Sequence, residues 1–406
     1  MKSGYIHSII DGKGAYQGKS YFFNEDRYFR YDWSLDRATD GYPIDNSAWG
    51  LPMGKSIDAS INGMEEYEGK GYFFIGDKYY RFDWNNDSMD EGYPGDLSVW
   101  GFPSSFSSGI DGAVNGKASY KGKAYFFKGN QYIRYDWKAD AVDSGYPQNL
   151  SAWKLPAPFS SGIDAVVNGQ GAYEGKLYFF KGNKYLRYDW ATDKVEKVNT
   201  IAGNWPLLVE LIQFGLGRKK VYEWMGKTQL MLTSYLANLK TGTVFSGNKS
   251  LFELALSTHF KINSSMPKAN KIAHLETIDS NYKKVKSALE NTDNVRGRDL
   301  DEAKLDQGVD SSGVSYPAYT FFDSSMNFTN TFTKFGPLCQ AAMVLHEPVH
   351  FVDSAATVSN DFYEHGSGYS TMNVNQAVHN PSSYVCFAQH LFYGSDTRYG
   401  AGKPNL

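Results

Sequence analysis

A histidine, a glutamate and a second histidine in the second half of the chain have the types and spacing of a metal-dependent hydrolytic site. They lie in the run 345–350, which reads Leu-His-Glu-Pro-Val-His. Positions i and i+4 of a helix share one face, so His346 and His350 can reach the same metal ion. Glu347 then projects beside the metal, where its carboxylate can take a proton from an activated water. The spacing predicts a zinc-dependent peptidase with Glu347 as general base.

The residues before this run favour a buried helix. Residues 339–345 read Cys-Gln-Ala-Ala-Met-Val-Leu, so a surface helix with two unrelated histidines is the less favoured interpretation. Pro348 lies inside the expected helix, where its missing N–H leaves the Val344 carbonyl without a partner. Such a proline costs about 3 kcal/mol and kinks a helix. Two outcomes stay open, catalysis despite the kink and metal binding without hydrolysis.

A catalytic zinc site needs a third protein ligand and an open fourth position. Asp361 is the preferred candidate after His350, and Glu364 and His365 are the alternatives. Ligating imidazoles usually donate their second N–H to a carboxylate or a carbonyl, which makes Asp353 a candidate partner. The remaining late histidines are expected to serve packing or the surface: His379 and His390.

Helical periodicity surrounds these residues from position 206 onward. Apolar side chains recur at helical spacing in 207–212, 251–260 and 272–289. Seven of the eight histidines, all except His7, lie after residue 250, as do both cysteines. Residues 206–406 are therefore expected to form a separate, mainly α (α+β) domain that positions the metal ligands. Its cysteines, Cys339 and Cys386, either pair or stay as buried thiols, the commoner state in a reducing compartment.

The first half consists of four copies of one repeat. A Gly-Lys-x-Tyr-Phe-Phe run begins at Gly18 and returns at Gly69, Gly122 and Gly175. Each copy continues to an Arg-aromatic-Asp-Trp run, and the tryptophans that end these runs recur about every 50 residues. These tryptophans are Trp33, Trp84, Trp137 and Trp190.

One copy of the repeat reads as four strands. In the third copy we expect strands over 110–115, 119–127 and 131–137, with Gly129-Asn130 as a turn. A short edge strand and a helical turn over 147–153 would complete the unit. Aromatic residues make up 16% of the chain, which fits sheets that pack aromatic and β-branched side chains. Four such units predict an all-β, four-bladed propeller.

The repeats resemble the hemopexin repeat found in matrix metalloproteases, plant seed albumins and photopexins. The resemblance implies a propeller domain over 1–205 with blades at about 5–53, 54–106, 107–159 and 160–205. Animal members join the first and last blades by a disulfide, which is missing here, so closure is expected to rest on packing alone. Aspartates at equivalent places are expected to hold turns or tryptophan N–H groups: Asp32, Asp83, Asp136 and Asp189.

In that family the first residues of the innermost strands present backbone carbonyls to a cation in the channel. The resemblance therefore implies a calcium or sodium ion at His7, Asp58, Asp111 and Asp164. His7 departs from the Ile-Asp start of the other three copies. The alternative is that the aspartates only end their strands and bind water. A haem is not expected, because His7 has no second histidine in these repeats.

Residues 250–400 resemble the aspzincin family, the deuterolysin-like and peptidyl-Lys metalloendopeptidases. That family joins His-Glu-x-x-His to a Gly-Thr-x-Asp-x-x-Tyr-Gly segment, which implies Asp361 as the third zinc ligand and Tyr363 as the transition-state tyrosine. Val358 and Ser359 replace the Gly-Thr pair, and Asp361 is followed by one residue more than the family pattern has. Three possibilities stay open for the tyrosine: Tyr363, a replacement by Tyr384 or Tyr369, or no tyrosine at all.

Two further segments carry the aspzincin resemblance. Residues 318–322 look like the edge strand along which such enzymes lay an extended peptide. Residues 380–388 look like the late Asn-x-x-x-Tyr helix of the family. Cleavage specificity is not readable from these segments.

Composition limits the remaining classes. The 41 basic and 44 acidic residues give a net charge of −3, which offers no support for nucleic-acid binding. No run approaches the ~18 consecutive apolar residues of a membrane-spanning helix. Residues 1–13 are too polar for a secretory signal peptide, so we expect a cytoplasmic protein or release by a non-classical route.

Two functions are compatible with the whole sequence. The first is a zinc endopeptidase acting on a protein or peptide, with the propeller as a module that binds a macromolecular or glycan target. The second is a non-enzymatic binding protein, for a glycan or small ligand or as a toxin-like factor, whose C-terminal half is a degenerate metalloprotease domain.

Overall fold

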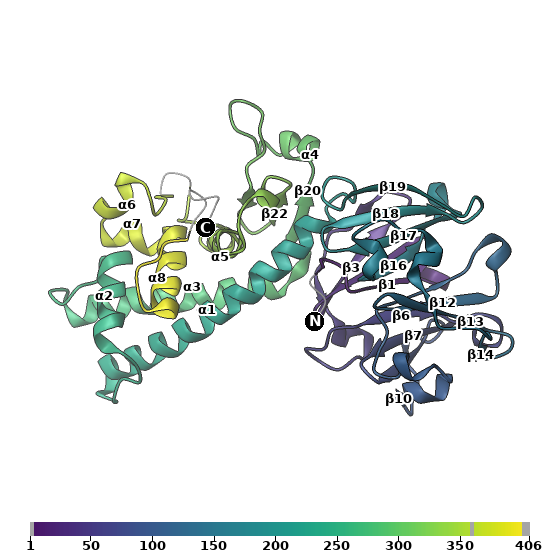
Figure 1. Ribbon diagram of the computed structural model, residues 1–406. Coiled ribbons are helices and arrows are strands. Elements are labelled where there is room, and N and C mark those ends of the chain that lie inside the picture. The colour runs from purple at the N-terminus through teal and green to yellow at the C-terminus, as the bar shows by residue number, and fades with distance from the viewer. Residues whose placement is uncertain (1–3, 358–360, 400–406) are drawn as a thin grey trace. The chain divides into compact units, whose positions relative to one another are not determined.

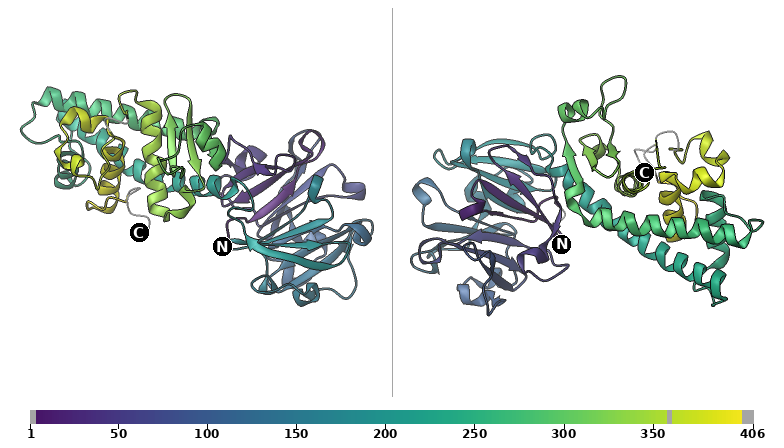
Figure 2. Two further views of the ribbon diagram at one scale, coloured as in Figure 1. Left: turned by 90° about the horizontal axis from the view of Figure 1, so that it is seen from above. Right: turned by 180° about the vertical axis from the view of Figure 1, so that it is seen from behind.

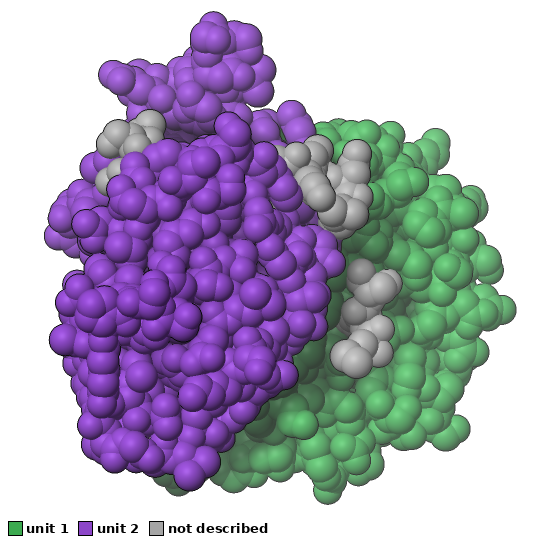
Figure 3. Space-filling model, turned by 90° about the vertical axis from the view of Figure 1, so that its left-hand side faces the viewer, with its two compact units in different colours: residues 1–212 green, residues 213–406 purple. Residues whose placement is uncertain are grey.

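The computed structural model describes residues 4–357 and 361–399. The chain divides into two compact units, residues 1–212 and 213–406, which Figure 3 colours separately. Unit 1 is built from sheets, and unit 2 is mainly helical (Figure 1). Within the described residues, no helix has both the length and the apolar composition to cross a membrane.

Unit 1 contains four antiparallel sheets with a shared strand order. In the first three sheets the third strand pairs with the second strand and with two short strands. The fourth sheet has one longer strand, β19, in place of the two short ones. The strands of the first two sheets are β1 Ser8–Asp11, β2 Lys19–Asn24, β3 Arg27–Asp32, β4 Arg37–Ala38, β5 Ile44–Asp45, β6 Ala59–Asn62, β7 Lys70–Ile75, β8 Lys78–Asp83, β9 Ser88–Met89 and β10 Gly95–Asp96. Those of the last two are β11 Gly112–Asn115, β12 Lys123–Lys128, β13 Gln131–Asp136, β14 Ala141–Val142, β15 Gln148–Asn149, β16 Ala165–Asn168, β17 Lys176–Lys181, β18 Lys184–Asp189 and β19 Lys194–Thr200.

The third sheet shows how closely the repeat pattern predicts the strands. The hairpin of β12 and β13 turns at Gly129, whose φ of +54° suits a residue without a Cβ. The strand expected over 119–127 begins only at Lys123, because Ala118–Tyr120 forms a 3-10 turn. The expected helical turn is present as the 3-10 helix Leu150–Trp153.

The first strands of the four sheets meet at the centre of unit 1. Strand β1 contacts both β6 and β16, and β11 contacts the same two strands. The middle phenylalanine of each Tyr-Phe-Phe run is fully buried between neighbouring sheets: Phe22, Phe73, Phe126 and Phe179. The inner strands and these rings form the core of the unit.

Unit 2 surrounds helix α5 with other helices and one small sheet (Figures 1 and 2). Helix α5 packs against α3 and α8 on its helical sides and against β21 and β22. The sheet has the order β20-β22-β21, so β21 is an edge strand. The elements are α1 Leu208–Thr241, α2 Lys249–His259, α3 Lys268–Glu290, β20 Val295–Arg298, α4 Leu300–Leu305, β21 Ala318–Phe321, β22 Ser325–Thr329, α5 Pro337–Val352, α6 Ser367–Thr371, α7 Val374–Val378 and α8 Pro381–Tyr393.

Candidate metal centre

Helix α5 carries both histidines of the sequence motif. It begins with Pro337 at its first turn, a position where the missing N–H costs nothing. The helix is assigned without interruption through Pro348 to Val352, so the proline does not end it. Its central residues are buried, which agrees with the expected core helix and excludes the surface-helix interpretation.

The side chain of Asp361 joins the two histidines. The Nε2 atoms of His346 and His350 are 3.2 Å apart, and Asp361 oxygens lie 3.5 Å from the first and 3.7 Å from the second. Ligands at about 2.0–2.2 Å from a tetrahedral zinc ion are separated by about 3.3–3.6 Å. The three donors therefore fit a zinc ion. Among the described residues, Asp361 Oδ1 is also a buried oxygen without a hydrogen-bond partner, as an atom reserved for a cation would be.

The second ring nitrogen of His350 contacts the main chain. Its Nδ1 lies 2.6 Å from the carbonyl oxygen of Ala356, so Nδ1 is the donor in this contact and Nε2 is the nitrogen that can ligate a metal. The Nδ1 of His346 lies 3.5 Å from the hydroxyl of Ser382 on α8. Asp353, the partner expected from the sequence, instead pairs with His379 at 2.8 Å. The expectation for Asp353 was wrong because the chain after α5 turns its carboxylate toward other groups.

Charge at the centre follows from burial and proximity. Burial disfavours a charged His346, yet the nearby carboxylate of Asp361 dominates and raises the pKa of His346 to about 9. Burial likewise opposes ionisation of Asp361, but the two imidazoles hold the pKa of Asp361 well below its usual range. The Asp361 carboxylate thus pairs with a positive charge, that of the protonated His346 ring, as it would with a bound metal cation.

Glu347 lies beside the histidines at a cleft of about 620 Å³. Its Oε2 accepts a hydrogen bond of 2.7 Å from the hydroxyl of Thr320 on β21. The cleft is lined by the metal-ligand candidates, by residues 316–320 leading into β21, and by Tyr363, Glu364 and Ser382. Thr320 was not predicted, and its signal in the sequence is only its place in the expected edge strand.

The structure separates the three tyrosine candidates. Tyr363 lines the cleft, and its ring stacks on His346 with centroids 5.7 Å apart. The hydroxyl of Tyr384 donates to the Val378 carbonyl at 2.7 Å, and that of Tyr369 contacts His259 at 2.9 Å. Both rings are buried away from the cleft lining. Tyr363 is the tyrosine that the fold brings to the metal ligands.

The reserve ligands lie next to the centre. Glu364 is buried at the cleft and accepts a 3.2 Å hydrogen bond from Ser382, while His365 lies 3.5 Å from its other oxygen. Neither belongs to the group of three donors that converge within 4.8 Å of one another. Val358 and Ser359 lie outside the described residues. Cys339 and Cys386 are both buried thiols.

The expected channel residues of unit 1 stand immediately before the inner strands. The aspartate side chains accept hydrogen bonds of 2.7 Å from hairpin glycines: Asp58 from Gly76, Asp111 from Gly129 and Asp164 from Gly182. In the first copy the His7 ring lies 3.2 Å from the Glu25 N–H, at the equivalent hairpin. These side chains thus tie each inner strand to its neighbouring hairpin.

A chain of asparagines at the other end of the inner strands was missed. Each asparagine amide donates to the carbonyl of the previous inner strand: Asn62 to Asp11, Asn115 to Asn62, and Asn168 to Asn115, at 2.7–2.8 Å. The same asparagines accept the indole N–H groups of Trp84, Trp137 and Trp190. The signal was present, since an asparagine ends the first strand in three of the four copies.

The repeated aspartates that end the third strands have one of their two expected roles. Asp83 accepts the Asn85 and Asn86 N–H groups and pairs with Lys70. Its counterparts likewise accept backbone N–H groups of the following turn and pair with a lysine. The turn role is therefore confirmed. The tryptophan role was wrong, because asparagines, or Ser20 in the first sheet, bind the indoles.

The first and last sheets are joined by a different set of groups. Asp11 stands where the other copies have asparagine and cannot donate to the last inner strand. Instead the amide of Gln170 donates to Asp11 Oδ1 at 2.8 Å, to the Ser20 hydroxyl at 3.1 Å and to the Lys19 carbonyl at 3.3 Å. Hydrogen bonds therefore supplement packing at this seam, contrary to the expectation that packing alone would serve.

Comparison with known proteins assigns unit 1. The Hemopexin family model matches residues 64–104, 110–157 and 163–206. Neutrophil collagenase of Homo sapiens is 33% identical over 129 residues, which cover 31% of this chain and 24% of that protein. Macrophage metalloelastase of Oryctolagus cuniculus is 30% identical over 182 residues, covering 44% and 36%. The chain thus spans only about a quarter to a third of the length of these relatives.

Two solved structures each match about half of this chain. A seed albumin from Lathyrus sativus is 23% identical with a TM-score of 0.43, covering 52% of this chain and 99% of that chain. A hemopexin fold protein from cow pea is 22% identical with a TM-score of 0.42, covering 51% and 97%. The family match and the collagenase relatives define the class: the N-terminal half is a hemopexin repeat domain, homologous to those of matrix metalloproteases.

Proposed function

We propose that the chain is a zinc-dependent endopeptidase with a hemopexin domain as its binding module. The observation that carries the proposal is the convergence of His346, His350 and Asp361 at one cleft, with Glu347 beside them. An aspartate as third donor agrees with the aspzincin resemblance of the sequence. Structural zinc sites usually have four protein ligands, whereas a three-donor site at an open cleft suits catalysis.

The side chains around the centre have distinct tasks in this proposal. Bound zinc supplies Lewis-acid chemistry, polarising the scissile carbonyl and lowering the pKa of a water. Glu347 takes a proton from the attacking water at its carboxylate and returns it to the leaving amine. Thr320 donates a hydrogen bond to one oxygen of that carboxylate, and the other oxygen remains available to accept the proton. Tyr363 donates its hydroxyl to the developing oxyanion.

Strand β21 offers a place for an extended peptide. It is the edge strand of its sheet, and residues 316–320 line the cleft beside the metal-ligand candidates. A peptide that adds to such an edge gains main-chain hydrogen bonds whatever its side chains are. The substrate class is therefore a protein or peptide in extended conformation.

For unit 1 we propose a closed four-bladed propeller that binds a macromolecular or glycan target. The mutual contacts of β1, β6, β11 and β16 and the Gln170 seam support closure. A calcium or sodium ion held by the backbone carbonyls of the residues before these strands belongs to the same proposal. Those residues are His7, Asp58, Asp111 and Asp164.

Metal content and proteolysis test the proposal together. We expect about one zinc per chain by plasma mass spectrometry after dialysis, and loss of that zinc in His346→Ala and Asp361→Ala. Glu347→Gln should keep the zinc and lose the cleavage of labelled casein. Zinc retained in Asp361→Ala would transfer the third-ligand role to Glu364 or His365. A chain that binds no zinc after reconstitution is the non-enzymatic binding protein instead.

A further inference from the structure

We propose that Asn380 is a positioning residue that holds the metal-ligand candidate Asp361 in place through the backbone of Phe362. The inference rests on the proposed function and adds a residue to it. Asp361 lies in a segment without helix or strand, so neighbouring elements must fix its carboxylate against the histidines of α5. Among the described residues, the Asn380 amide and the Arg398 guanidinium are side chains that bind backbone groups of this segment.

Asn380 binds both backbone groups of the residue after Asp361. Its Oδ1 accepts the Phe362 N–H at 2.9 Å, and its Nδ2 donates to the Phe362 carbonyl at 3.1 Å. The side chain is fully buried, and Nδ2 also lies 3.1 Å from the hydroxyl of Ser383. The Asn380 amide thus satisfies both the N–H and the C=O of Phe362, as the backbone of a neighbouring strand would.

The position of Asn380 makes this use of its side chain unusual. It is the N-cap residue of α8, yet it makes no side-chain cap hydrogen bond to its own helix. Asn373, the N-cap of α7, makes the ordinary choice and accepts the Gln376 N–H at 3.0 Å. Asparagine at an N-cap normally stabilises its helix by such a bond, typically about 1 kcal/mol. The Asn380 side chain lacks that bond and instead makes two hydrogen bonds to the backbone of Phe362, next to Asp361.

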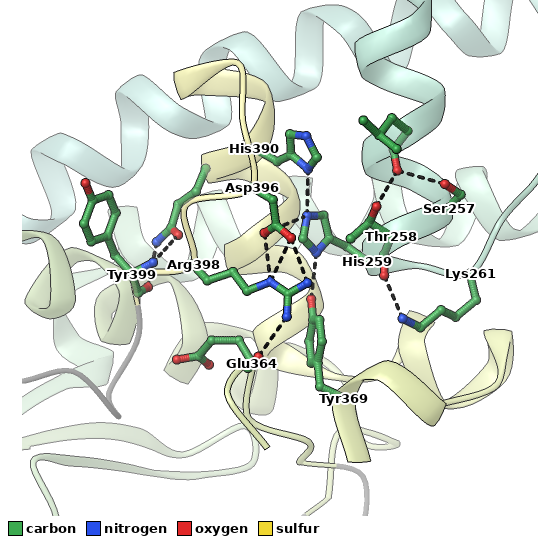
Figure 4. A network of polar contacts seen from close by, with 12 residues as sticks. Ser257, Thr258, His259, Lys261, Glu364, Tyr369, His390, Asp396, Arg398 and Tyr399 are labelled. Carbon is green, nitrogen blue, oxygen red and sulfur yellow. Dashed lines mark hydrogen bonds and ion pairs between the residues drawn. The ribbon is translucent and has the colours of Figure 1, made fainter. Parts of the chain in front are cut away.

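Arg398 holds the other end of the same segment. Its guanidinium donates to the Glu364 carbonyl at 3.1 Å, is held by Asp396 at 2.7 Å, and lies over the Tyr369 ring (Figure 4). Tyr369 contacts His259, which contacts His390 at 3.0 Å. The segment 361–364 is thus fixed at both ends by groups that are themselves anchored.

The group of His259, His390 and Asp396 has metal-ligand spacing but is better explained as an anchor. The Arg398 guanidinium contacts both oxygens of Asp396, and Lys261 lies against the same Tyr369 ring. Two positive charges and one carboxylate oppose a further cation. Burial lowers the pKa of His259 to about 3, so the ring is neutral and its nitrogens complete the hydrogen-bonded chain.

The matched test compares Asn380→Ala with Asn373→Ala in the full chain. Both variants remove an asparagine at a helix N-cap, but only the first touches the ligand segment. We expect zinc affinity, measured by competition with a chromogenic chelator, to fall about 10- to 100-fold in Asn380→Ala, the range for losing a group that orients a ligand. The visible absorption of the Co²⁺-substituted chain should change in this variant and not in Asn373→Ala.

A second readout does not need the metal. In the metal-free chain, amide hydrogen exchange at Phe362 should become faster in Asn380→Ala and stay unchanged in Asn373→Ala. If wild type binds zinc and Asn380→Ala matches it in affinity, spectrum and exchange, the positioning role is refuted and the zinc site stands. If wild type binds no zinc, the proposed function fails and the positioning role with it, whatever the exchange shows.

Discussion

The seam between the first and last sheets of unit 1 gives the most quantitative prediction, the loss of stability in Gln170→Ala. The Gln170 amide donates to three acceptors, and the nearest is the carboxylate of Asp11 at 2.8 Å. Burial raises the pKa of Asp11, so its carboxylate depends on these donors when it is ionised. Without Gln170, Asp11 keeps the Ser20 hydroxyl at 2.6 Å.

The expected cost follows from the kind of bond that is lost. A hydrogen bond to a charged group contributes about 1.5–3 kcal/mol. For a domain of this size each kcal/mol shifts the melting temperature by about 2–4 °C, so we expect a decrease of about 3–12 °C. Lys117→Ala is the comparison variant, because Lys117 occupies the same place in its repeat, acts on Asp11 through its charge, and makes a solvent-exposed ion pair with Glu174 at 3.0 Å. Such a pair contributes about 0–1 kcal/mol.

Tryptophan fluorescence is the suitable assay. All nine tryptophans except Trp224 lie in unit 1, so the emission reports the melting of that unit in the full chain. Gln170→Glu keeps the size of the side chain but places a second carboxylate against Asp11, and it should destabilise more at pH 7 than at pH 4. Equal melting temperatures for Gln170→Ala and Lys117→Ala would refute the reasoning that this amide holds the seam.

Three further predictions concern charge and catalysis. Burial opposes ionisation of Asp32, but hydrogen bonds from Lys19 and the Ser34 groups hold the pKa of Asp32 at about 2. The pair therefore stabilises the fold above pH ~4, and its contribution is lost as the pH falls toward 2. In Lys19→Met the midpoint of urea unfolding should depend less on pH between pH 5 and pH 3, and a pH dependence equal to that of wild type would contradict this. Tyr363→Phe should lower kcat by about 10²–10³ with zinc content unchanged, whereas Tyr384→Phe should lower stability and leave kcat unchanged; the reverse pattern would reassign the oxyanion donor. Removal of zinc by a chelator should lower the melting temperature of unit 2, followed by far-UV circular dichroism, since a ligand that binds only the folded state stabilises it; no change would argue against a bound metal.

The local pattern of the sequence determined the repeats and their strands. Sheet periodicity and hairpin glycines act over a few residues, so the central strands of each sheet were predictable from one copy of the repeat. The same holds for His346, Glu347 and His350, because helix geometry alone places i and i+4 on one face. The family match then agrees with the repeat assignment for unit 1.

Tertiary structure decided which distant groups meet these local patterns. The sequence favoured Asp361 over Glu364 as third ligand, but spacing alone does not fix which side chain faces the histidines, because the segment has no regular structure and Asn380 and Arg398 hold its backbone. The Gln170 seam likewise joins residues from opposite ends of unit 1. Such contacts depend on how elements far apart in the chain pack. The sequence therefore limits each role to a few candidate residues, and the tertiary contacts determine which of them lies at the site.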